Sequence, residues 1–162
     1  MLLAVFSDSH GRPGAMRRAV ETRRPDHIVF LGDGLRDAER LGREFPQIPL
    51  LLLRGNCDWN AAEIKSQESA LFRLAGVRIF AAHGHRYGVK QGLESFANSV
   101  HCSGALLGLY GHTHIPRITE THGLTLMNPG SVGSHDSPSY GLVWLENGAF
   151  RCEVIKDCED QL

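Results

Sequence analysis

Each of five short apolar runs in this sequence is followed within a few residues by side chains that can bind a divalent metal ion. These side chains are Asp8 and His10 after residues 2–6, Asp33 after 27–31, Asn56 after 50–53, His83 after 77–82, and His112 and His114 after 105–110. Asp offers a charged oxygen, Asn a carbonyl oxygen and neutral His a ring nitrogen. Nitrogen and oxygen donors without a thiolate suit Mn, Fe, Ni or Zn better than Ca or a structural zinc finger.

Seven candidate ligands exceed what one ion of four to six ligands needs, so the sequence predicts two ions that share a carboxylate. Two ions about 3.5–4 Å apart can bridge a hydroxide and hold phosphoryl oxygens. With two carboxylates and one hydroxide their charge sums to roughly +1, which attracts an anion. Each Asp or His taken alone would more often be a turn, capping or surface residue, so the prediction depends on the joint pattern.

The predicted elements of the first half would place these side chains together. Residues 2–6, 27–32 and 48–53 predict strands, and apolar residues at helical spacing in 16–24 and 35–45 predict the connecting helices. Strands joined in this way run parallel. Ligands then lie beyond the carboxyl ends of the strands, where the adjacent glycines permit sharp turns.

The second half is richer in predicted strands. Residues 70–82, 117–128 and 140–155 predict hairpins that turn at 75–76, 122–123 and 147–148, while 105–111 predicts a strand and 89–100 a helix. Two sheets packed together, with the helices outside, would bury these elements. We therefore expect an α/β fold and one domain over residues 1–162.

Composition excludes several function classes. The 17 Lys and Arg residues nearly balance the 18 Asp and Glu residues, for a net charge of −1, so nucleic-acid or membrane-surface binding is not indicated. No apolar run reaches membrane-spanning length, and the first residues lack the basic region of a signal peptide. The four cysteines form no C-x-x-C pair. These features predict a cytoplasmic protein with reduced thiols.

The ligand motifs resemble those of the calcineurin-like metallophosphoesterase superfamily. Five motifs occur in the family's order: Asp8-x-His10-Gly11, Gly32-Asp33, Gly55-Asn56, His83-Gly84 and Gly111-His112-x-His114. The sequence NPGS follows at 128–131. The short chain, GNCD at 55–58 and NPGS are similar to the small YfcE-type phosphodiesterase branch. The resemblance implies an αββα two-sheet sandwich flanked by helices. It also assigns Asp8, His10, Asp33 and His114 to one metal, and Asp33, Asn56, His83 and His112 to the other, with Asp33 bridging.

The sequence departs from other branches of the family at two places. The G-D-x-x-D-R-G pattern of the protein Ser/Thr phosphatases is absent, because the stretch at 31–40 reads LGDGLRDAER. Many members carry a general-acid His directly after the Asn, where this chain has Cys57. The thiol could donate a proton, become a thiolate ligand of a nearby ion, or be inert. His85 is the competing proton donor or only a neighbouring histidine.

The remaining polar residues carry weaker predictions. Asp58 is expected to be a turn or helix-capping residue before WNAAEI at 59–64. His27, His101 and His122 are interpreted as structural, and His135 as a candidate for a substrate-binding loop.

The leading functional prediction is a metal-dependent phosphodiesterase whose dinuclear centre activates hydroxide for attack on phosphorus. The expected cofactors are two Mn²⁺ ions, with Fe, Ni and Zn as alternatives. The expected partner is a small phosphate ester. A homo-oligomer is compatible with the sequence. The retromer subunit of this fold looks like a partner-binding module with a compromised site, so a non-catalytic metal-binding scaffold is one alternative. A nucleotide monoesterase or pyrophosphohydrolase is another.

Overall fold

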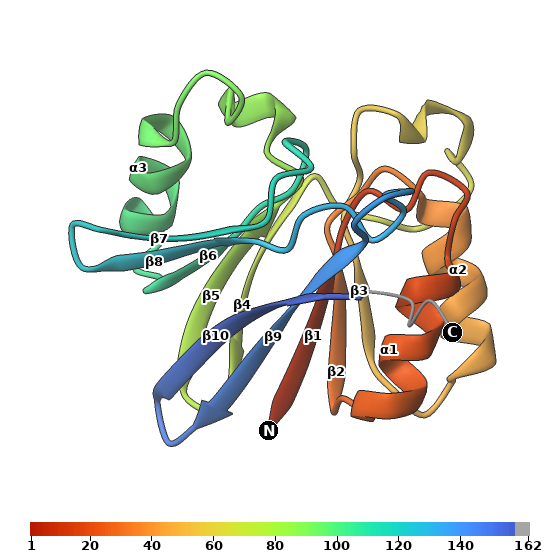
Figure 1. Cartoon of the computed structure of the whole chain (residues 1–162). Helices are drawn as coiled ribbons and strands as arrows, with labels where there is room; N and C mark the ends of the chain where they lie inside the picture. The colour runs from red at the N-terminus through yellow and green to blue at the C-terminus, as the bar shows by residue number, and fades with distance from the viewer. Residues whose placement is uncertain (158–162) are drawn as a thin grey trace.

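The computed structural model describes residues 1–157, which form two five-stranded β-sheets (Figure 1). The first sheet has the order β10 (Ala149–Lys156), β9 (Ser139–Glu146), β1 (Leu2–Phe6), β2 (His27–Phe30) and β3 (Leu50–Leu52). The second has the order β4 (Ser69–Leu74), β5 (Val77–Ala82), β6 (Leu107–Leu109), β8 (Leu124–Asn128) and β7 (Arg117–Thr121). As predicted, β1, β2 and β3 are parallel, and the three hairpins form.

Helices cover the outer faces of both sheets. The helices α1 (Gly14–Arg23) and α2 (Leu35–Glu44) lie against the first sheet, and α3 (Glu94–Cys102) lies against the second, at the opposite side of the molecule (Figure 1). Two short 3-10 helices, η1 (Asp58–Asn60) and η2 (His85–Tyr87), lie in the loops after β3 and β5. The predicted αββα sandwich is therefore confirmed.

Strand β1 shows why its sequence is apolar without alternation. Leu3 and Val5 pack into the core between the two sheets, whereas Ala4 and Phe6 pack into the core beneath α1 and α2. Successive side chains of a strand point to opposite faces, so a strand covered on both faces needs apolar residues at every position.

The helix predicted over 89–100 begins later than expected, because α3 starts at Glu94. Val89 is buried against the α3 side of the second sheet, which explains the apolar periodicity that suggested a helix. It nevertheless lies in a turn after Gly88, whose φ of 63° is in the left-handed region. Its side chain also packs closely over Gly84, where a Cβ would collide with it. Glycine at both places favours the turn.

None of the helices within residues 1–157 has the length and apolar character needed to span a bilayer. The three cysteines in this part of the chain, Cys57, Cys102 and Cys152, are free. Cys158 lies outside the described residues.

Candidate metal centre

Loops at the carboxyl ends of strands from both sheets bring six of the seven predicted ligands together, all except Asn56. Their donor atoms fall into three groups, each with all its atoms within 4.8 Å of one another: Asp8, His10 and His114; His10, Asp33 and Cys57; and Asp33, His83 and His112. Asp33 shares one group with His10 and another with two further histidines. That position between the two sets of donors is the one a bridging carboxylate requires.

In the first group, one carboxylate oxygen of Asp8 accepts hydrogen bonds from the protein, and the other faces the ring nitrogens of two histidines. Asp8 Oδ2 accepts hydrogen bonds from Ser7 Oγ at 2.5 Å and from the His112 amide at 3.1 Å. Asp8 Oδ1 lies 3.1 Å from Nε2 of His114 and 3.7 Å from Nε2 of His10, yet this buried oxygen accepts no well-formed hydrogen bond within residues 1–157. The geometry suits a cation between these atoms.

The second group is organised around His83, whose side chain is fully buried. His83 Nδ1 lies 3.1 Å from the carbonyl oxygen of Leu31, so the ring donates there and Nε2 carries the free lone pair. His83 Nε2 lies 3.4 Å from Asp33 Oδ2 and is another buried atom without a hydrogen bond in the described chain. The protein thus fixes the orientation of this ring, with Nε2 turned toward Asp33.

Asp33 is held in its charged form. Burial raises the pKa of its carboxyl group, but the close approach of the His83 ring, 3.4 Å from Oδ2, outweighs that effect, as do the bonds from Cys57. The result is a pKa well below the usual range for Asp. Asp33 Oδ1 accepts the backbone N–H of Cys57 at 2.7 Å, which ties the carboxylate to the loop after β3.

The two histidines of the loop after β6 titrate in opposite directions. Burial lowers the pKa of His112 to about 4, assisted by the charges of His83 and Lys90. The Asp8 carboxylate, 3.1 Å from Nε2, raises the pKa of His114 above its ordinary value, against the effect of burial. At neutral pH His112 is therefore ready to bind a cation, whereas His114 must first compete with a proton.

Backbone strain is concentrated at the candidate ligands. Nine non-glycine residues within 1–157 have a positive φ, and five of them are candidate ligands: Asp8 (56°), His10 (44°), Asp33 (59°), His112 (68°) and His114 (60°). A left-handed conformation costs a non-glycine residue on the order of 1 kcal/mol. The fold must therefore impose these conformations through the contacts around the loops.

Asp58 supplies the most extensive of these contacts. Its buried carboxylate accepts four backbone N–H groups, from Asp33 at 2.8 Å, Gly34 at 2.9 Å, Leu35 at 3.0 Å and Gly55 at 2.8 Å. These bonds join the loop after β2 to the loop after β3, and they satisfy amides at the start of α2, which has no cap from its own Gly34. Asp58 begins the turn of η1 as expected, but it does not cap a helix in its own loop: the amides that it binds are at the start of α2.

Three other side chains hold the ligand-bearing loops in place, and none of the three was predicted from the sequence. Asn128 Nδ2 donates to the carbonyl oxygen of Gly111 at 2.9 Å, and Ser131 Oγ donates to that of Asp8 at 2.7 Å, which gives the NPGS motif its structural role. Asp37 Oδ2 accepts Ser9 Oγ at 2.6 Å and the Gly11 N–H at 2.8 Å. The sequence marked Asp37 only as an acidic residue in the first turn of the helix predicted over 35–45.

Of the three predicted catalytic residues, Asn56, Cys57 and His85, Cys57 belongs to one of the donor groups. The Asn56 side-chain nitrogen donates to Sγ of Cys57 at 3.3 Å, and its amide oxygen accepts no hydrogen bond from the described residues. Partial burial, with Asp33, Asp58 and Asp8 nearby, raises the pKa of Cys57 to about 11, so it is a thiol at neutral pH. The His85 ring lies 5.3 Å from that of His83 but outside the three donor groups, and burial lowers its pKa.

Comparison with known proteins agrees with this geometry. Residues 1–148 match the model of the calcineurin-like phosphoesterase superfamily domain. The chain is 30% identical over 153 residues to the "Probable metallophosphoesterase YsnB" of Bacillus subtilis, covering 92% of this chain and 87% of that one. It is 27% identical over 183 residues to "Phosphodiesterase YfcE" of Escherichia coli K12, covering 97% and 94%.

Among solved structures, Vps29 of Entamoeba histolytica complexed with Zn²⁺ has the same fold, with a TM-score of 0.75 at 19% identity over 96% of this chain and 99% of that one. The family match and the similarity to YfcE confirm the predicted class of enzyme, a metal-dependent phosphoric ester hydrolase. The chain belongs to the calcineurin-like phosphoesterase superfamily.

Proposed function

We propose that this chain is a phosphodiesterase with two divalent metal ions. One ion would be held by Asp8, His10, Asp33 and His114. The other would be held by Asp33, Asn56, His83 and His112. The observation that carries this proposal is that Asp33 belongs to two of the three donor groups, one with His10 and the other with His83 and His112.

Two buried atoms test whether metal ions fit these residues. Asp8 Oδ1 and His83 Nε2 have no hydrogen bond within residues 1–157, and each such atom costs about 1–3 kcal/mol when it stays unsatisfied. An ion in each donor group would satisfy both atoms. The side-chain nitrogen and oxygen donors favour Mn²⁺, and they keep Fe, Ni and Zn as alternatives.

The chain's own residues divide the remaining work. Divalent ions at such a site generate a nucleophile from water at neutral pH and offset the negative charge on phosphoryl oxygens. Asp33 stays charged between the two donor sets, and the bond from His83 to Leu31 keeps that imidazole in its ligand form. Cys57, a thiol at neutral pH, and His85 are the two candidates that would give a proton to the leaving group. A thiol with a pKa of about 11 is a weak acid, which suits diesters with good leaving groups.

The shape of the site supports a small substrate. A cavity of about 260 Å³ beside the proposed centre is lined by His10, Asp33 and Cys57. Loops from both sheets complete the centre, so we also propose that residues 1–162 act as one domain.

A non-catalytic scaffold is the second candidate, because Vps29 shares the fold. Against it, every predicted ligand position of this chain holds a capable donor, and five of these residues are kept in strained conformations. Strain of this kind clusters at working sites.

The proposal is tested by metal content and turnover of the same reconstituted protein. Elemental analysis should give two ions per chain, and bis(p-nitrophenyl) phosphate should be cleaved faster than p-nitrophenyl phosphate. His112→Ala should lower both metal content and turnover, whereas His101→Ala, an exposed histidine of α3, should change neither. A stoichiometry of one or zero would refute the dinuclear centre. Two ions without turnover of any ester would favour the scaffold, and faster cleavage of the monoester would favour a monoesterase.

A further inference from the structure

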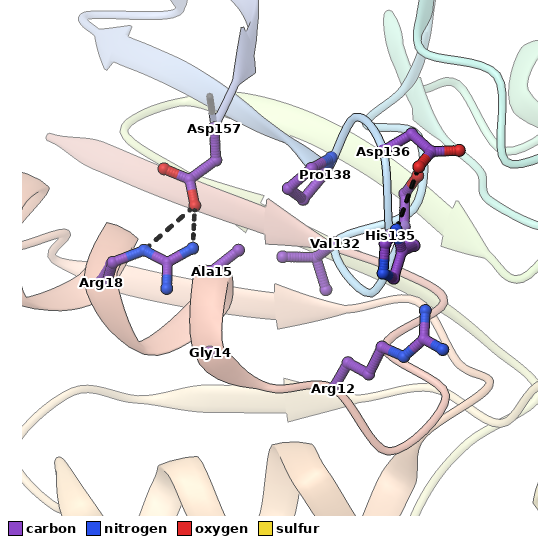
Figure 2. A pocket seen from close by; sticks show the side chains of 10 residues that line it. Arg12, Gly14, Ala15, Arg18, Val132, His135, Asp136, Pro138 and Asp157 are labelled. Carbon is purple, nitrogen blue, oxygen red and sulfur yellow. Dashed lines mark hydrogen bonds and ion pairs between the residues drawn. The ribbon is translucent and has the colours of Figure 1, made fainter. Parts of the chain in front are cut away.

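A cavity of about 630 Å³ lies beside the first turns of α1 (Figure 2). The β1–α1 loop, the first turns of α1, the β8–β9 loop and the end of β10 form its walls. Its polar and charged lining consists of Arg12, Arg18, Ser134, His135, Asp136 and Asp157. Nothing in the proposed hydrolysis at the metal centre uses these side chains.

The cavity and the centre share a wall. The Val132 N–H donates to the carbonyl oxygen of Ser7 at 2.9 Å, and the Gly133 N–H donates to that of Asp8 at 3.2 Å, so the β8–β9 loop lies directly against the ligand-bearing loop. Arg12 follows His10 by two residues, which limits the distance between their Cα atoms to about 7 Å. A single small substrate can therefore contact both places.

The ion pairs described within residues 1–157 for this cavity involve Asp157 and Asp136 but not Arg12. Asp157 is bound by Arg18 at 2.6 Å, and Asp136 lies 3.0 Å from the ring of His135. The guanidinium of Arg12 makes only a long hydrogen bond, 3.5 Å, to the carbonyl oxygen of Gly133, and it has no carboxylate partner within residues 1–157. In Figure 2, Arg12 extends toward the loop that carries His135.

We propose that this cavity binds a second anionic group of the substrate, a phosphate or a carboxylate, through Arg12. The guanidinium presents a planar fork of donors that matches the oxygens of either anion. Ser134 Oγ accepts the Ser137 N–H at 3.3 Å, so its own hydrogen is free to point at the anion, and the His135 ring lines the same wall. This inference rests on the proposed function, because it makes the preferred substrate a phosphodiester that carries a further anion.

A matched pair of substrates tests the inference. Thymidine 5′-(p-nitrophenyl phosphate) is compared with the same compound carrying a 3′-phosphate, and kcat/KM is measured from p-nitrophenolate release. We expect the Mn²⁺-loaded protein to prefer the 3′-phosphorylated diester by about 10- to 100-fold, mainly through KM. A third compound with a 3′-hemisuccinate shows whether a carboxylate serves as well as a phosphate.

Arginine variants decide whether Arg12 is responsible. Arg12→Gln should remove most of the preference and Arg12→Lys should restore part of it, because a point charge without the fork binds the anion less well. Arg73→Gln, at an exposed arginine of β4 whose side chain bonds the carbonyl oxygen of Gly76, should keep the preference.

Two results would overturn the inference, and they are distinguishable. Equal kcat/KM values for the two diesters in the wild type, or a preference that survives Arg12→Gln, would remove the anion subsite while leaving the phosphodiesterase intact. Two bound ions with no turnover of either diester would overturn the proposed function and this inference with it.

Discussion

Replacing Asp58 by Asn keeps the volume of the side chain but removes half of its capacity to accept hydrogen bonds. Oδ2 accepts the N–H groups of Asp33 and Gly55, and Oδ1 accepts those of Gly34 and Leu35. In Asn one of these oxygens becomes an NH₂ group, which cannot accept a bond and faces two backbone donors. Either orientation of the amide therefore loses one pair.

The magnitude follows from these contacts. A hydrogen bond to a charged group contributes about 1.5–3 kcal/mol, so losing two of them should cost about 3–6 kcal/mol. Domains are stable by only about 5–15 kcal/mol, so the variant should be close to unfolding when metal-free. The variant molecules that remain folded should bind metal about 10- to 100-fold more weakly. The reason is the loss of hydrogen bonds that join the loops carrying Asp33 and Asn56.

Urea unfolding of the metal-free protein, followed by circular dichroism, measures the first effect, and metal titration measures the second. Asp26→Asn is the matched control, since Asp26 accepts one exposed N–H, that of Leu2, and its loss should cost less than about 1 kcal/mol. A loss for Asp58→Asn no larger than that of the control would refute the reasoning.

Three further outcomes follow from the proposed centre. Asp33→Asn should lower the metal content from two ions toward zero in elemental analysis, because both ions lose the charge of the bridge; retention of both would contradict bridging. A histidine binds metal only when neutral. Falling pH should therefore release the ion of the His114 group first, since the pKa of His114 is raised above 6.5, whereas His112 stays neutral down to about pH 4. Metal binding followed against pH should show two steps, and a single common step would count against this order. Cys57→His should raise turnover of alkyl monoesters by up to about 10²–10⁴-fold, most for the poorest leaving groups; an unchanged dependence on the leaving group, with both ions bound, would show that position 57 does not serve the proton transfer.

Periodicity predicted the elements of the fold where local patterns and packing agree. The hairpin turns at 75–76, 122–123 and 147–148 fall between strands as expected, each with a residue of positive φ before the glycine. The start of α3 was wrong because Val89 is apolar for a contact with Gly84 and the α3 cluster. Periodicity records which residues are buried, but it does not tell a helix from a turn that buries the same side chain.

The positions of the candidate ligands could be predicted because strand ends in parallel sheets face one edge. The residues that hold those ligands could not, because their contacts cross long stretches of sequence. Asp58 reaches Asp33 from 25 residues away, and Ser131 reaches Asp8 from 123 residues away. A polar residue in a loop gives no sign of which distant amide or carbonyl it will meet.

The strained conformations of the candidate ligands lower the stability of the fold. Five left-handed residues cost together roughly 5 kcal/mol or more, and glycine would adopt each conformation without that cost. Substituting glycine at these positions should therefore make the metal-free chain harder to unfold while removing its donors. In a lineage freed from catalysis, we expect these positions to drift first, toward residues that relax the loops.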